Sequence, residues 1–165
     1  MKIPFSPDTV DWSPITLPFA KLSTSFVSGI QDRDRIHIEY FESKDKNKLV
    51  AKVHFGAFAA GPPKYAHGGA QAAVLDEVCG GIVWLKRHKA LAAKLETEFF
   101  NMVPLETDLY ATAEITKVEN RKVFTEGALF LPEGDLLAKA TVLFVKLSDS
   151  QIDHLNSKVE GTGVM

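Results

Sequence analysis

Alternating apolar and polar positions mark two strand segments in the first half of the chain. In residues 35–42 and 48–58 every second residue is apolar, which is the period of a strand with one buried face. The segment between them, SKDKNK, is polar and typical of a turn. The pattern therefore predicts a β-hairpin built from these two strands.

A different period begins near residue 69. Prolines and glycines in GPPKYAHGG, residues 61–69, interrupt regular structure, and apolar residues then recur every three or four positions. This predicts a helix over residues 69–89, roughly 32 Å long at 1.5 Å per residue. Its apolar arc is wide, so we expect burial on most sides, and KRHK at 86–89 suits a helix C-terminus. Buried helix positions expected from this pattern are Ala72, Leu75 and Val83.

Four further strand-like segments follow, separated by short polar breaks. Because these breaks suit an antiparallel meander, the order predicts one sheet of five or six strands wrapped around the helix, an α+β fold. Residues 1–17 show no period and predict an irregular arm, and residues 18–31 predict a short helix that ends near Gly29. We expect an N-terminal arm at 1–33, a main domain at 34–147 and a tail at 148–165. The four strand segments are 93–103, 108–119, 122–131 and 136–147.

Composition narrows the classes of function. The chain has 165 residues, 45% of them hydrophobic and 24% charged, values typical of one globular domain. Its formal net charge of −2 argues against nucleic acid as a partner. Since no segment approaches roughly 18 consecutive apolar residues, and no signal peptide is visible, we expect a cytoplasmic protein without membrane insertion.

The first candidate for chemistry is His67-Gly68-Gly69, where the loop becomes the helix. A helix N-terminus offers unpaired backbone N–H groups and a partial positive charge, and glycine lets a ligand approach these donors closely. Such a site stabilises an oxyanion without a charged side chain. The alternative is a loop that simply requires two glycines.

The second candidate is Asp76, a carboxylate on the apolar stripe of the helix. Burying a carboxylate is costly unless it is paired or used in chemistry, and the alternative places Asp76 at the solvent edge. Glu77 points about 100° away from it. Gly68 and Asp76 stand eight residues apart, roughly 12 Å along the helix axis, so they cannot act on one carbonyl within one subunit. Their cooperation therefore requires a dimer with antiparallel helices.

Other catalytic motifs are missing from the sequence. It has no His-Glu-x-x-His helix, no Gly-x-Ser-x-Gly elbow, no Gly-x-Gly-x-x-Gly segment and no P-loop. A zinc deaminase site needs a pair of cysteines, whereas Cys79 is alone and suits packing. We therefore expect no metal and no cofactor.

The strand order together with HGGAQAAVLDEVCGG resembles the hotdog-fold acyl-CoA thioesterases of the phenylacetate-degradation and thioesterase-superfamily-member type. The resemblance covers about residues 34–147, and FFNMVPL and VENRKVFTEGAL add to it. It implies a hotdog fold and hydrolysis of acyl-CoA. It also implies a homodimer or a dimer of dimers.

The resemblance also implies roles for individual residues. Asp76 takes the place of the family's carboxylate, which activates water or attacks the thioester, and Gly68 that of the backbone donor to the thioester oxygen. His67 and Gly69 stand beside it as substrate-binding residues, and Arg121 and Lys122 fall where many members carry basic residues near the CoA phosphates.

Two departures from the family keep other functions open. Relatives often place a Ser or Thr at the position of Ala92, to hold the water, and some carry an Asn or Gln where Gly61–Tyr65 stands. A non-catalytic acyl-CoA binding or regulatory protein of the same fold is the main alternative. A hydratase is a weaker one, because it requires a His-acid pair and only His67 is near.

Overall fold

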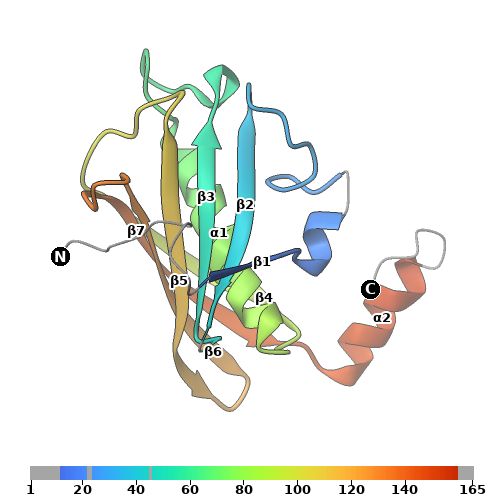
Figure 1. Cartoon of the computed structure of the whole chain (residues 1–165). Helices are drawn as coiled ribbons and strands as arrows, with labels where there is room; N and C mark the ends of the chain where they lie inside the picture. Colours follow the sequence, from blue (N-terminus) through green and yellow to red (C-terminus); the bar gives the residue numbers. More distant parts are fainter. Residues whose placement is uncertain (1–11, 22–23, 45, 160–165) are drawn as a thin grey trace.

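The structure, a computed structural model, describes residues 12–21, 24–44 and 46–159. A strongly curved sheet encloses one long helix, α1, and a second helix stands apart at the C-terminal end (Figure 1). This is the arrangement that the resemblance implied. Besides two short 3₁₀ segments, the elements are β1 (Trp12–Ile15), β2 (Ile36–Ser43), β3 (Lys48–Phe55), α1 (Gly68–Leu85), β4 (Ala90–Phe99), β5 (Asp108–Glu119), β6 (Lys122–Phe130), β7 (Leu136–Lys146) and α2 (Asp149–Val159).

The sheet has seven strands in the order β1-β2-β3-β5-β6-β7-β4, with every neighbouring pair antiparallel. The predicted hairpin is confirmed as β2 and β3. The predicted four-strand meander is wrong at its first strand, because β4 pairs with β7 instead of β5. The segment after β4 instead crosses to β3, where β5 pairs, and β4 becomes an edge of the sheet.

Helix α1 lies in the concave face of the sheet and forms the centre of the core. Leu75 and Val83 are fully buried, as predicted, whereas Ala72 is only half-buried. The predicted C-terminal end was four residues too late. The helix ends at Leu85, and Arg87 follows with a left-handed φ of 60°, so KRHK forms a turn into β4. Cys79 is free and buried in the core, as expected for a packing residue.

Both ends of the chain differ from the sequence predictions. Residues 12–15 of the predicted irregular arm form β1, which pairs with β2, while residues 1–11 lie outside the described part. The predicted helix at 18–31 is reduced to one 3₁₀ turn, Pro18–Lys21, followed by turns. The predicted tail contains α2. Its mean hydropathy is low, so the sequence pattern did not predict this helix.

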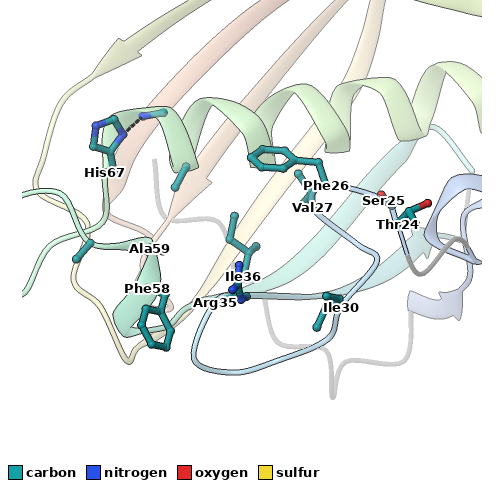
Figure 2. A pocket seen from close by; sticks show the side chains of 13 residues that line it. Thr24, Ser25, Phe26, Val27, Ile30, Arg35, Ile36, Phe58, Ala59 and His67 are labelled. Atoms are coloured by element: carbon teal, nitrogen blue, oxygen red, sulfur yellow. Dashed lines mark hydrogen bonds between the residues drawn. The ribbon is translucent and has the colours of Figure 1, made fainter.

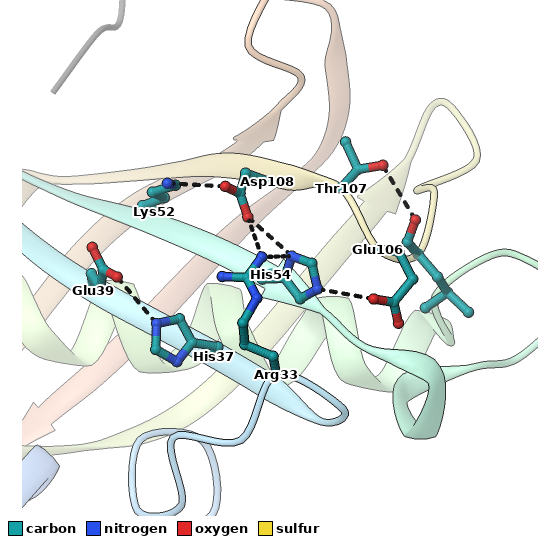
Figure 3. A network of polar contacts seen from close by, with 9 residues as sticks. Arg33, His37, Glu39, Lys52, His54, Glu106, Thr107 and Asp108 are labelled. Atoms are coloured by element: carbon teal, nitrogen blue, oxygen red, sulfur yellow. Dashed lines mark hydrogen bonds and ion pairs between the residues drawn. The ribbon is translucent and has the colours of Figure 1, made fainter. Parts of the chain in front are cut away.

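A network of charged groups fixes the segment before β2 to the outer face of the sheet (Figure 3). The Arg33 guanidinium donates to the Asp108 carboxylate at 3.1 Å and lies 2.9 Å from Nδ1 of the buried His54. Lys52 binds the other Asp108 oxygen at 2.9 Å, and its hydrogen bond holds the pKa of Asp108 down at about 2. Residues 31–35 are therefore anchored to β3 and β5.

Candidate functional site

His67 caps the N-terminus of α1 and fixes the geometry of its first turn. Its Nδ1 accepts the Gly69 N–H at 2.9 Å, and its carbonyl accepts the amides of Ala70 and Gln71. Since Nδ1 is an acceptor here, the neutral ring carries its proton on Nε2. Within the described residues of this chain, His67 has no carboxylate partner.

Gly68 is the remaining donor of this turn. Its N–H has no acceptor within the described residues, whereas the Gly69 amide is bound by His67. A Cβ at Gly68 would lie 3.3 Å from Cζ of Phe99, so the backbone and this ring are in close contact. Of the three residues in His-Gly-Gly, Gly68 therefore has the amide that is free to bind an oxyanion.

Asp76 lies on α1, half-buried, and its Oδ1 is buried without a hydrogen-bond partner within the described residues. Burial raises the pKa of this carboxyl above its ordinary value. One carboxyl oxygen is thus withdrawn from solvent, although the residue as a whole is only half-buried. A buried carboxyl oxygen without a partner is costly, and this is the environment in which a general base or nucleophile is found.

Two further buried polar atoms without partners lie on α1 and on the strand β4. Buried oxygens of Gln71, on α1, and Thr97, on β4, likewise have no partner among the described residues. Thr97 pairs with the buried Ala140 of β7 and so shares its face toward α1. Sequence reasoning missed both residues, and the alternation of Leu95, Thr97 and Phe99 along β4 was the available signal.

Glu77, unlike its neighbour Asp76, has hydrogen-bond partners for its carboxyl group. Its Oε1 accepts hydrogen bonds from the hydroxyls of Ser28 and Tyr40, which are themselves 2.7 Å apart. Burial raises the pKa of Glu77, and the two hydrogen bonds partly offset this. Glu77 therefore joins α1 to β2 and to the segment before it, on another face than Asp76.

Continuity of α1 keeps Gly68 and Asp76 apart, roughly 12 Å along the axis, as expected. Arg121 and Lys122 lie at the β5–β6 turn, beside the start of β4 and so near the C-terminal end of α1. Arg121 donates to the Lys146 carbonyl at 2.9 and 3.1 Å. One chain alone therefore brings neither Asp76 nor the two basic residues to Gly68.

Among the described residues, no three His, Cys, Asp or Glu side chains form a group able to hold a metal ion. Within the same part of the chain, no helix has both the length and the apolar character to cross a bilayer.

Comparison with known proteins shows what this chain is similar to. The model of the thioesterase superfamily matches residues 64–138, which include α1, β4, Gly68 and Asp76. The resemblance to the thioesterase superfamily is confirmed. The chain is similar to acyl-coenzyme A thioesterase THEM4 of Xenopus laevis, 32% identical over 120 residues, or 70% of this chain and 54% of that protein. It is also similar to acyl-coenzyme A thioesterase THEM5 of Homo sapiens, 28% identical over 112 residues, or 67% of this chain and 45% of that protein. The chain thus spans about half the length of these curated relatives.

Solved structures show the fold. A crystal structure of a thioesterase superfamily protein aligns with a TM-score of 0.64 at 26% identity, over 67% of this chain and 54% of that one. A thioesterase protein with coenzyme A from Streptococcus pneumoniae gives 0.62 at 16% identity, over 70% and 90%. The PaaI protein of E. coli gives 0.60 at 16%, over 67% and 82%. The fold of this chain is the α+β hotdog fold.

Proposed function

We propose that this chain is an acyl-CoA thioesterase, which hydrolyses the thioester bond to a free acid and CoA. The observation that supports this most is that one helix carries both a backbone amide at Gly68 without an acceptor among the described residues and a carboxyl at Asp76 with one buried, unpartnered oxygen. Thioester hydrolysis requires a donor for the developing oxyanion and an activated nucleophile, and these two groups supply them. The THEM4 and THEM5 relatives, named acyl-coenzyme A thioesterases, support the substrate class.

In the proposed mechanism Asp76 acts as general base. It takes a proton from water while the water oxygen bonds to the thioester carbon, and the carbonyl oxygen gains the negative charge held by the Gly68 N–H. Collapse of this intermediate breaks the C–S bond, and the CoA thiolate receives a proton. As a nucleophile, Asp76 would instead form an anhydride that water then hydrolyses. Neither route calls for a metal or a cofactor.

The two groups act together only across a subunit boundary, and β4 supplies a suitable edge. This ten-residue strand lies at the end of the sheet order, and most of its side chains are exposed. Leu91, Leu95 and Phe99 are 52, 39 and 53% exposed, an apolar edge of the kind that pairs with another strand. Antiparallel pairing of two β4 strands about a two-fold axis sets the two α1 helices antiparallel, so that each Gly68 approaches the partner's Asp76.

In this dimer the anionic end of a bound CoA can reach Arg121 and Lys122. From Gly68 to the C-terminal end of its own α1 is about 26 Å. When Gly68 lies opposite the partner's Asp76, the end of the partner's helix is only about 14 Å away. Lys122 and Arg121 of the second chain then lie on the path of the anionic end of CoA. Lys122 is exposed, whereas part of the Arg121 guanidinium is already bound to the Lys146 carbonyl.

The test is thiol release by Asp76→Asn beside Glu77→Gln. Both variants exchange a partly buried carboxyl of α1 for an amide of the same shape. Asp76→Asn removes the base, and we expect kcat to fall on the order of 10²-fold or more. Glu77→Gln weakens a structural hydrogen-bond cluster and should affect kcat far less. If Asp76→Asn retains most of the wild-type kcat while Glu77→Gln does not, the assignment is wrong.

One observation favours a second candidate, an acyl-CoA binding protein without turnover. Ala92 offers no hydroxyl at the position where many thioesterases hold the water. Thr97 is the available substitute, because its hydroxyl is buried, has no partner among the described residues and lies on the face of β4 toward α1. Wild-type protein that binds acyl-CoA by calorimetry but releases no thiol would establish the binding protein instead.

A further inference from the structure

An apolar groove of about 810 Å³ lies beside the N-terminus of α1 (Figure 2). One wall is the segment before β2, with Phe26 and Ile30 directed into it, and the opposite wall carries Phe58. His67 and Gly69 line the end next to the helix. Its volume falls in the range of roughly 300–1,000 Å³ that is usual for small-molecule sites.

The exposed apolar residues of the groove are held in place by buried neighbours. Phe26 is 85% and Ile30 62% exposed, yet Val27 and Ser28 between them are 4% and 1% exposed. Ser28 is fixed by its hydrogen bonds to Glu77 and Tyr40. Exposed apolar side chains on an anchored segment indicate a binding surface and not a loose loop.

The second wall is equally well fixed. The Phe58 amide donates to the Asp34 carbonyl at 2.8 Å, and the Arg35 carbonyl accepts the Gly56 amide. Phe58 itself is 77% exposed, and the Arg35 guanidinium lies 6.0 Å from its ring centroid. Among the described residues of the lining, Arg35 is the one with a permanent charge, and none of them carries a carboxylate.

A second, smaller hollow lies on the other side of the same helix end, toward β4. Gly68, Phe99 and Met102 line it, and it shares no lining residue with the groove. The N–H groups of a first helical turn point out along the axis. A carbonyl bound to the Gly68 N–H therefore lies at the helix end, and its two substituents lead off toward different sides.

We propose that the groove binds the acyl chain of the substrate, while the thiol side leaves through the hollow at β4. This rests on the proposed function. CoA must run toward β4, because the partner's Lys122 and Arg121 lie across that edge, and the groove on the other side is left for the acyl group. Aromatic and aliphatic walls without a carboxylate suit an unbranched apolar chain. The walls at 24–36 and 58–60 lie outside the residues 64–138 that the family model matches, and on this proposal they set the preferred length of the acyl chain.

The experiment measures kcat/KM for dodecanoyl-CoA and acetyl-CoA with wild type and with Phe26→Asp combined with Phe58→Asp. Carboxylates in the groove penalise an apolar chain, so the ratio of dodecanoyl to acetyl kcat/KM should fall at least about tenfold. Both sites are exposed, so folding should survive, which the melting temperature checks. Phe41→Ala, on β2 outside the groove, is the control and should leave the ratio unchanged.

Failure of this proposal is distinguishable from failure of the proposed function. A dodecanoyl to acetyl ratio that stays at the wild-type value in the double variant overturns the groove assignment and leaves hydrolysis intact. If wild type hydrolyses neither substrate, binding of 11-(dansylamino)undecanoic acid tests whether the groove binds an apolar chain. Fluorescence enhancement that the double variant loses and Phe41→Ala keeps supports the groove, and equal enhancement in all three proteins overturns it.

Discussion

Asp76 and Glu77 are adjacent on α1, yet Asp76 has a buried oxygen without a partner whereas Glu77 accepts two hydrogen bonds. The 3.6-residue period was enough to predict that they face different directions. It was not enough to predict their partners, because Ser28 and Tyr40 come to Glu77 from 49 and 37 positions away. Gly68 and Asp76 could be selected from helix periodicity, whereas Thr97 and Gln71 required knowledge of which side chains lack partners.

The raised pKa of Asp76 gives a prediction for stability. A carboxyl whose pKa is raised on folding disfavours the folded state once it is ionised, so its cost is absent at low pH and appears as pH rises through the folded pKa. Asp76→Asn removes this cost. We expect the variant to melt at a higher temperature than wild type at pH 7–8, with the gain shrinking toward pH 4. A variant less stable than wild type at pH 8 would contradict this.

A second prediction concerns the hydroxyl of Thr97. Thr97→Val keeps the shape and deletes a buried hydroxyl that has no partner among the described residues, so stability should be equal or higher. If the hydroxyl holds the attacking water, kcat should fall roughly tenfold at little change in KM. Thr97→Ser is the matched control and should keep most of the activity. Equal kcat values for the Val and Ser variants would show that the Thr97 hydroxyl does not hold the attacking water.

Periodicity predicted most elements, but not how they pair. Both strands of the β2–β3 hairpin, helix α1 and the four later strands were predicted within a few residues of their observed bounds. The position of β4 at the far edge was missed, because strand periodicity carries no information on pairing partners. Helix α2 was missed since its apolar residues are few, and β1 because it is only four residues long.

The start of α1 offers a test of the oxyanion donor. Gly68 is the first residue of the helix, where proline is tolerated, and His67 before it has the extended backbone that proline prefers. Gly68→Pro thus deletes the one free amide and keeps the helix. We expect kcat to fall by about 10²–10³. Gly68→Ala adds a Cβ against Phe99 but keeps the N–H, and should lose much less. Similar losses in both variants would point to crowding instead of a lost donor.

The proposed site requires a second copy of the chain. Gly68, the proposed oxyanion donor, and Asp76 lie on one helix, and the exposed apolar edge of β4 is the proposed contact with a partner. Single variants of Gly68 or Asp76 do not test whether the proposed site is shared between subunits, because each variant is expected to lose activity in either arrangement. Two inactive variants combined in one dimer distinguish a site shared between subunits from a site within one subunit.

The decisive measurement is thiol release from an equimolar mixture of Gly68→Pro and Asp76→Asn proteins, unfolded and refolded together. In half of the resulting dimers, one of the two sites joins an intact Gly68 from one chain to an intact Asp76 from the other. The account therefore predicts recovery of about a quarter of the wild-type activity from two nearly inactive proteins. Differently tagged chains verify that mixed dimers form. Mixed dimers without recovered activity would contradict a site shared between subunits.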